Sequence, residues 1–125
     1  MFTADQTAPR LAVIDTQTNR LKQWLGLPGI AYGTAPTPDG RWLLIALIGT
    51  NAVGLLELDS LQLARTIDVP KSPQQIVVRP DGRFAYVSCD QSRKVAVLDL
   101  EACKVERLID AGALADGLAW AASQP

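Results

Sequence analysis

The sequence predicts an all-β protein made of four-stranded antiparallel β-propeller blades, with about three blades in its 125 residues. Two observations support this fold class. A block of sequence returns with a period of about 42 residues. Each period holds four short segments rich in β-branched, aromatic or other apolar residues, separated by turn signals. We expect the blades to form an open arc or half of a ring.

The period is set by repeated motifs. The tetrapeptide PDGR begins at Pro38 and again at Pro80, and the distance between the two copies defines the period. A strand-like segment keeps the same spacing, beginning at Leu21, Leu63 and Val105. All repeats belong to one domain, 1–125, whose approximate units are 1–41, 42–83 and 84–125.

A further motif, an apolar run that ends in aspartate, is spaced less evenly. The aspartates are Asp15, Asp59 and Asp99, so the first interval is longer than the period and the second is shorter. We therefore expect two extra residues near 48–50 and two fewer after Asp59, because hairpin turns tolerate such length changes. We interpret the three aspartates as turn formers that accept hydrogen bonds from the following backbone amides.

The last complete unit illustrates the four predicted strands. The predicted strands are 74–79, 84–89, 94–98 and 105–110. A Pro-Asp-Gly turn joins the first two, and the glycine supplies the positive φ of a tight hairpin. Runs such as WLLIALI at 42–48 are apolar on successive residues, which favours strands covered on both faces over a one-sided sheet. A tandem helical repeat of similar period is disfavoured by PDG at its centre.

The two ends of the sequence match different strands of a blade. Residues 1–4 align with 85–88, the second strand, and residues 115–121 align with 73–79, the innermost strand. The chain therefore starts on strands two to four of one blade and ends on the first strand of another. We expect it to pair with a second copy as a homodimer, or to be joined by additional blades of a longer propeller.

Residues 79–88 (RPDGRFAYVS), together with Val97-Leu98-Asp99, resemble the YVTN-type repeat of surface-layer and other bacterial β-propellers. The first unit matches through 13–15 and 38–40, but it departs from the family at 43–46 (Leu-Leu-Ile-Ala), where the tyrosine-valine pair is missing. The resemblance implies that the segment before PDG lines the central channel. It implies no single function, since such propellers serve as binding platforms, enzymes and surface proteins, often periplasmic or at the cell surface.

The composition of the chain bears on which classes of partner are expected. With 12 basic and 13 acidic residues, the net charge is -1, and no basic stripe suggests nucleic acid or an anionic membrane. The longest apolar run, 42–48, is much shorter than a membrane span of roughly 20 residues. The N-terminal residues do not resemble an export signal. We therefore expect neither a nucleic-acid nor a membrane partner.

The sequence offers no catalytic constellation. It contains no histidine, and neither Cys89 nor Cys103 belongs to a Cys-x-x-Cys pair, so we expect no metal, no cofactor and no catalytic residue. The two cysteines fall at opposite ends of the predicted blade, too far apart for a disulfide. Propeller lactonases of similar repeat use histidine and arginine. The alternative function is therefore a partial propeller of a larger enzyme, lactonase-like or oxidoreductase-like, with its catalytic residues on other blades.

A binding surface is easier to place. In a propeller, two sets of strand connections gather on one face around the channel, where partners usually dock. Tyr32, Gln74 and Asp116 occupy the same repeat position there, and three different polar side chains suit a recognition surface. Solvated loop residues are the competing interpretation. The predicted ligand-binding residues, for a protein or a small molecule, are Tyr32, Gln74, Asp116, Lys71, Arg93 and Trp120.

Overall fold

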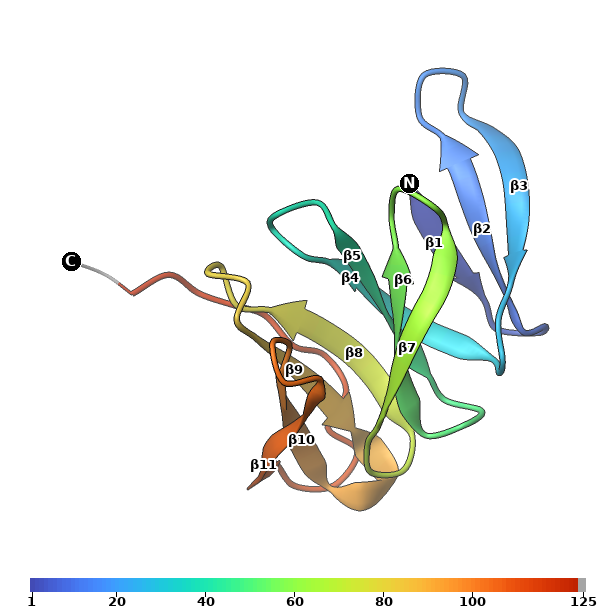
Figure 1. Ribbon diagram of the computed structural model, residues 1–125. Helices are drawn as coiled ribbons and strands as arrows, with labels where there is room; N and C mark the ends of the chain where they lie inside the picture. Colours follow the sequence, from blue (N-terminus) through green and yellow to red (C-terminus); the bar gives the residue numbers. More distant parts are fainter. Residues whose placement is uncertain (124–125) are drawn as a thin grey trace.

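The computed structural model describes residues 1–123 and consists of three antiparallel sheets that follow one another along the chain (Figure 1). The first sheet contains β1 (Phe2–Asp5), β2 (Arg10–Asp15) and β3 (Arg20–Gly26). The second contains β4 (Ala31–Pro36), β5 (Trp42–Leu47), β6 (Ala52–Glu57) and β7 (Gln62–Asp68). The third contains β8 (Pro73–Val78), β9 (Phe84–Cys89), β10 (Lys94–Asp99) and β11 (Lys104–Asp110). The predicted all-β class and the three-blade organisation are confirmed.

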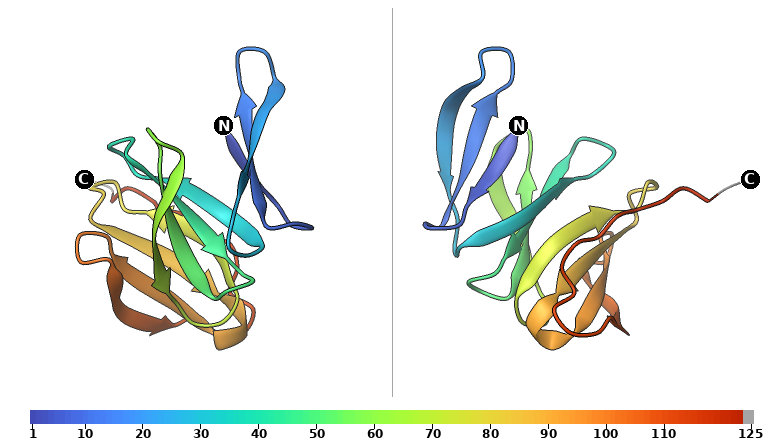
Figure 2. Two further views of the ribbon diagram at one scale, coloured as in Figure 1. Left: turned by 45° about the vertical axis from the view of Figure 1, so that its right-hand side comes forward. Right: turned by 180° about the vertical axis from the view of Figure 1, so that it is seen from behind.

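Each sheet is a meander whose strands pair in chain order, and we call the three sheets the first, second and third blades. The blades pack face to face, with β4 lying against both β1 and β8, as both views of Figure 2 show. The innermost strands β4 and β8 therefore lie side by side at one edge of the stack. In the part of the chain that the structure describes, the first blade has no innermost strand beside β1.

Packing on both faces explains the unbroken apolar run of β5. Leu43, Ile45 and Leu47 belong to the cluster between the first and second blades. Leu44 and Ala46, which alternate with them, belong to the cluster between the second and third blades. Successive side chains of a strand point to opposite faces, so a strand between two blades needs apolar residues at every position. The predicted two-sided burial is confirmed.

The repeat keeps a constant period, and the expected insertion near 48–50 is wrong. Strands β2, β6 and β10 end at Asp15, Glu57 and Asp99, which are equally spaced along the chain. Asp59 is thus not equivalent to the other two aspartates. The reason is the strand register: Leu44 pairs with Leu55 just as Tyr86 pairs with Val97. The apolar run before Asp59 resembles the runs before Asp15 and Asp99 in sequence, but it is not in the same register.

The turn-forming role predicted for the aspartates holds at two of the three positions. Asp15 Oδ1 accepts a hydrogen bond from the Gln17 amide at 2.8 Å. Asp99 Oδ1 accepts from the amides of Glu101 and Ala102, both at 3.0 Å. In the second blade the Leu61 amide bonds instead to the Glu57 carbonyl at 2.8 Å. The backbone closes this turn by itself.

The two Pro-Asp-Gly turns have the predicted conformation. Gly40 and Gly82 adopt φ values of 72° and 74°, in the left-handed region. Their amides donate to the carbonyls of Thr37 at 3.0 Å and Arg79 at 2.8 Å, respectively. The carboxylates of Asp39 and Asp81 accept from the amides of Arg41 and Arg83, both at 3.0 Å.

Replacing Gly82 by valine is expected to lower the free energy of unfolding by about 1 to 3 kcal/mol, because a β-branched residue would be forced to positive φ. Urea denaturation measures the change. Gly82→Asn is the matched control, since asparagine tolerates this region and should recover most of the loss. Equal stability of Gly82→Val and the parent chain would rule out a strained hairpin at this position.

The two cysteines are free, as expected from their places at opposite ends of the third blade. Cys89 is fully buried, and desolvation raises the pKa of its thiol to about 11. Cys103 is half-buried in the β10–β11 turn.

We expect one thiol, that of Cys103, to react with a disulfide reagent such as DTNB at pH 8 in the folded protein. The second thiol should react only after unfolding in guanidinium chloride, because Cys89 is inaccessible and protonated when buried. The Cys103→Ser variant identifies the fast thiol. If neither thiol reacted, even after unfolding without reductant, the two cysteines would be joined by a disulfide and the blade layout would be incorrect.

The C-terminal segment, residues 111–123, departs from the sequence-based expectation. The repeat predicts an innermost strand at 115–121, but the structure assigns no strand there. The segment instead runs along the face of the third blade that points away from the second (Figures 1 and 2). A strand needs a hydrogen-bonding neighbour, and within the described residues this segment pairs with no strand.

Candidate functional site

The candidate site lies at the end of the blades formed by loops 48–51, 69–72 and 90–93, which we call the loop end. These loops are hydrogen-bonded to one another. The Ser72 amide donates to Asn51 Oδ1 at 3.0 Å, which joins the first two loops. The Lys71 amide donates to Ser92 Oγ at 2.8 Å, which joins the second to the third. The loop end is thus a connected surface across the second and third blades.

A small polar cluster lies beneath this surface. Gln74 is only 7% exposed, and its Nε2 donates to Ser72 Oγ at 2.9 Å and to Asp90 Oδ2 at 3.3 Å. The Asp90 amide in turn donates to the Ser72 carbonyl at 3.2 Å. These bonds satisfy polar groups that would otherwise be costly to bury.

One buried oxygen atom of this cluster has no hydrogen-bond partner. Among the described residues, Asp90 Oδ1 is the buried side-chain oxygen or nitrogen atom without a hydrogen-bond partner. A carboxylate oxygen buried without a donor is destabilising, so water, a cation or a donor group of a ligand is expected beside it. Asp90 begins the 3₁₀ turn Asp90–Ser92, which ends at Arg93 with a φ of 55°.

Three of the residues predicted from the sequence meet at the loop end. Lys71 and Arg93 are exposed and come from the two loops joined through Ser92. Gln74 lies behind them in β8, and its amide points into the polar cluster instead of to the solvent. Its part in ligand binding, like that of the two cations, stays a prediction.

The other three predicted residues lie elsewhere. Tyr32 is half-buried on β4 of the second blade. Asp116 is exposed on the C-terminal segment, where its carbonyl accepts a hydrogen bond from Ser88 Oγ. Trp120 is 44% exposed and lies over Tyr86, with the ring centroids 5.9 Å apart. The structure does not join these residues to Lys71, Gln74 and Arg93.

Sequence reasoning missed Ser72, Ser88 and Asp90. The sequence held a signal for them. With the constant period, their equivalent positions in the second blade are occupied by apolar residues, namely Ile30, Ala46 and Ile48. Positions that are apolar in one blade and polar in the next mark where the blades differ in chemistry.

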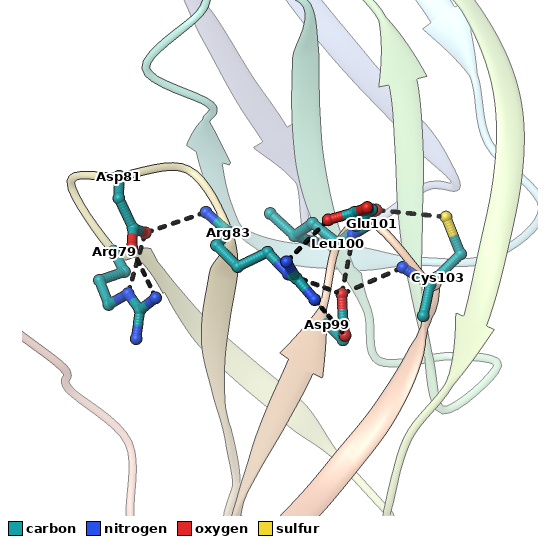
Figure 3. A network of polar contacts seen from close by, with 8 residues as sticks. Arg79, Asp81, Arg83, Asp99, Leu100, Glu101 and Cys103 are labelled. Carbon is teal, nitrogen blue, oxygen red and sulfur yellow. Dashed lines mark hydrogen bonds and ion pairs between the residues drawn. The ribbon is translucent and has the colours of Figure 1, made fainter.

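The opposite end of the third blade carries an ionic network, drawn in Figure 3. Arg83 forms ion pairs with Asp99 at 3.3 Å and with Glu101 at 2.7 Å. Arg79 Nε donates to Asp81 at 2.9 Å, and this bond holds the pKa of Asp81 down to about 2. The hydrogen bond with Asp99 raises the pKa of Arg83. These contacts brace the Pro-Asp-Gly turn against the β10–β11 turn, and we interpret the network as structural.

Two cavities adjoin this network between the second and third blades. One of about 280 Å³ is lined by Asp39, Trp42 and Arg83, among others. A second of about 450 Å³ is lined by Trp42, Arg41 and Arg65, among others. Among residues 1–123 no group of three or more metal-binding side chains is found, and no helix there has the length and hydropathy to cross a membrane.

No protein-family model and no curated protein matches the sequence. Solved structures do match. Hydrazine synthase of Kuenenia stuttgartiensis superimposes with a TM-score of 0.80 at 24% identity, over 86% of this chain and 31% of that chain. The fold is a segment of a β-propeller. Dihydro-heme d1 dehydrogenase NirN, solved in complex with DHE, matches with a TM-score of 0.71 at 17% identity, over 86% of this chain and 23% of that chain.

The propeller segment therefore spans less than a third of each of these two chains. At these identities the likeness concerns the fold, and a propeller fold hosts many unrelated functions. The function has to be argued from the residues of the loop end.

Proposed function

We propose that this chain is part of a β-propeller binding scaffold, and that its loop end holds a partner that carries carboxylate groups. One observation supports the proposal above others. Lys71 and Arg93 are exposed on two hydrogen-bonded loops, and neither forms an ion pair within the described residues. Two cations on hydrogen-bonded loops, neither of them in an ion pair within the described residues, suit an anionic partner.

The loops themselves are suited to this role. The Lys71 amide donates to Ser92 and the Ser72 amide to Asn51, so hydrogen bonds hold the backbone of the loops that carry Lys71 and Arg93. A braced surface loses less conformational entropy when it binds than a mobile loop does.

The proposal can be tested with fluorescein-labelled hexaglutamate as the probe and fluorescence anisotropy as the readout. The probe should bind at low salt, and Lys71→Ala or Arg93→Ala should each weaken binding by up to about fivefold, since an exposed charge pair is worth up to about 1 kcal/mol. Lys22→Ala, which removes an exposed lysine on β3, is the matched control and should leave the affinity unchanged.

Hexalysine with the same label controls for nonspecific association and should not bind. Failure of hexaglutamate to bind, or an equal loss of affinity in Lys22→Ala, would contradict a carboxylate site at the loop end.

A second candidate is a partial propeller of a larger enzyme, whose catalytic residues lie on blades outside this chain. It is supported by the matched structures, which are named as a synthase and a dehydrogenase and are much longer than this chain. Sequencing the DNA on both sides of the reading frame separates the candidates. Further repeats of the same period that contain histidine would favour the enzyme. Kinship with the YVTN-type repeat belongs to the same proposal and is supported by the hairpin at residues 79–88.

A further inference from the structure

One cavity of the molecule lies outside the loop end and has the size of a small-molecule site. It has a volume of about 450 Å³ and lies between the second and third blades, and we call it the inter-blade cavity. Trp42, Ala64 and Arg65 of the second blade line one side, and Leu100 and Cys103 of the third line the other, among others. The third-blade residues belong to the β10–β11 turn beside the ionic network (Figure 3). Pockets for small ligands typically measure about 300 to 1,000 Å³.

Small side chains keep the inter-blade cavity open. Cys103 is the repeat equivalent of Leu61, and the two residues adopt φ values of 54° and 56° in corresponding turns. Leu61 packs against the apolar cluster between the first and second blades, whereas Cys103 puts a shorter side chain at the next junction. Ala64, left unpaired at the β-bulge of β7, is also shorter than its equivalents Lys22 and Glu106. The space between these two blades therefore depends on the residues at positions 64 and 103.

The inter-blade cavity carries positive charge that is not neutralised within the described residues. Arg41 and Arg65 line it, and neither forms an ion pair in residues 1–123. Glu101 also lines the cavity, but its carboxylate already pairs with Arg83 at 2.7 Å. A guanidinium group can bind a carboxylate through two parallel hydrogen bonds, so two such groups at one cavity favour an anionic ligand.

The rest of the lining is largely apolar and includes an aromatic ring. Trp42 and Leu100 line both this cavity and the adjoining one of about 280 Å³, and Leu55 lines the larger of the two. Trp42 is half-buried, and Arg41 Cζ lies 4.9 Å from the centroid of its ring. A tryptophan ring offers a flat apolar surface, and a guanidinium group stacks on such rings. A planar apolar group suits this lining.

The inter-blade cavity thus combines two guanidinium groups with an aromatic wall. We propose that it binds a small aromatic carboxylate, whose ring packs against Trp42 and whose carboxylate pairs with Arg65 and Arg41. The ligand neutralises positive charge that the described residues leave unpaired, and its ring removes apolar surface from water. The site is independent of the loop end, because none of the residues that line it belongs to loops 48–51, 69–72 or 90–93.

Equilibrium dialysis of the full chain with 2-naphthoate tests the proposal. The probe should bind saturably, and the uncharged 2-naphthamide, which has the same ring, should bind roughly tenfold more weakly. Arg65→Ala should also weaken naphthoate binding roughly tenfold, because a charge-assisted hydrogen bond is lost. The matched control is Arg107→Ala, which should leave the affinity unchanged. Arg107 pairs with Val97 just as Arg65 pairs with Leu55, but it lies one blade further on and does not line the cavity.

Two further variants and a labelling experiment test where the probe binds. Cys103→Leu introduces the residue that the second blade has at this position, and Ala64→Glu introduces the residue of the third. Each should abolish naphthoate binding, the first by filling the cavity and the second by adding a carboxylate to it. Circular dichroism should show both variants folded, since other blades hold these residues at the equivalent positions. In the parent chain, saturating naphthoate should prevent labelling of Cys103 by iodoacetamide, while Cys89 stays unlabelled throughout because it is buried.

Three results would overturn the proposal. They are equal affinities for naphthamide and naphthoate, equal losses of affinity in Arg107→Ala and Arg65→Ala, and labelling of Cys103 that is as fast with bound probe as without it. Unchanged binding by folded Cys103→Leu and Ala64→Glu would also exclude the inter-blade cavity as the site. Lys71→Ala should not alter naphthoate binding, and Arg65→Ala should not alter hexaglutamate binding, so failure of this inference and failure of the proposed function can be distinguished.

Discussion

Replacing Gly33 by valine is expected to lower the free energy of unfolding by about 3 kcal/mol, the upper end for overpacking. Gly33 lies on β4, the innermost strand of the second blade, beside β8 of the third blade. A Cβ atom there would lie 2.5 Å from the Gln74 carbonyl oxygen and 3.0 Å from the Gln75 Cα. Both obstacles are backbone atoms of β8, so a side-chain rotation cannot relieve the clash.

Urea denaturation at matched protein concentration measures the effect of Gly33→Val. The control is Gly26→Val, because Gly26 also lies in a strand but a Cβ atom added to it would have no neighbouring atom within 4 Å. We expect that control to change stability by no more than about 0.5 kcal/mol. Similar stabilities of the two variants would mean that β4 and β8 are not in close contact, and would argue against face-to-face packing of the blades.

Truncating Leu44 to alanine is the second large effect, with an expected loss of about 2 to 5 kcal/mol. Leu44 is 0% exposed and belongs to the cluster between the second and third blades, together with Val53, Ala85 and Leu98. Removing three carbon atoms there leaves a cavity between two rigid sheets, which cannot collapse as a loop would.

Leu21→Ala provides the comparison, since Leu21 is a strand leucine that is 50% exposed on β3. Its expected cost is about 0.5 kcal/mol or less. Thermal or urea unfolding of the two variants at one concentration separates the predictions. Equal losses at Leu44 and Leu21 would be incompatible with a core shared by neighbouring blades.

These effects bear on function because the loop end is assembled by the same packing. Asn51 reaches across from the second blade to the Ser72 amide, so the distance between the blades sets the geometry under Lys71 and Arg93. A variant that loosens the blades, such as Leu44→Ala, should therefore weaken hexaglutamate binding although it lies away from the loop end. Binding variants have to be checked for folding before their affinities are compared.

Local sequence determined the parts of the structure that depend on short-range physics. The Asp-Gly pairs at 39–40 and 81–82 favour tight hairpins, because glycine adopts positive φ more readily than residues with a Cβ atom. The regular return of those pairs along the chain then predicts successive four-stranded blades. The unbroken apolar run of β5 likewise predicts burial on both faces, since alternating side chains point to opposite sides.

Tertiary contacts decided the rest. The register of the second blade follows from the pairing of Leu44 with Leu55, which no local pattern around Asp59 reveals. Gln74 is a polar residue at a loop-facing position, yet its amide is buried, because Asp90 of a later loop accepts a hydrogen bond from it alongside the neighbouring Ser72. Residues 115–121 align with an innermost strand, but a strand exists only where another strand supplies hydrogen bonds. Within the described part of the chain, these residues pair with no strand.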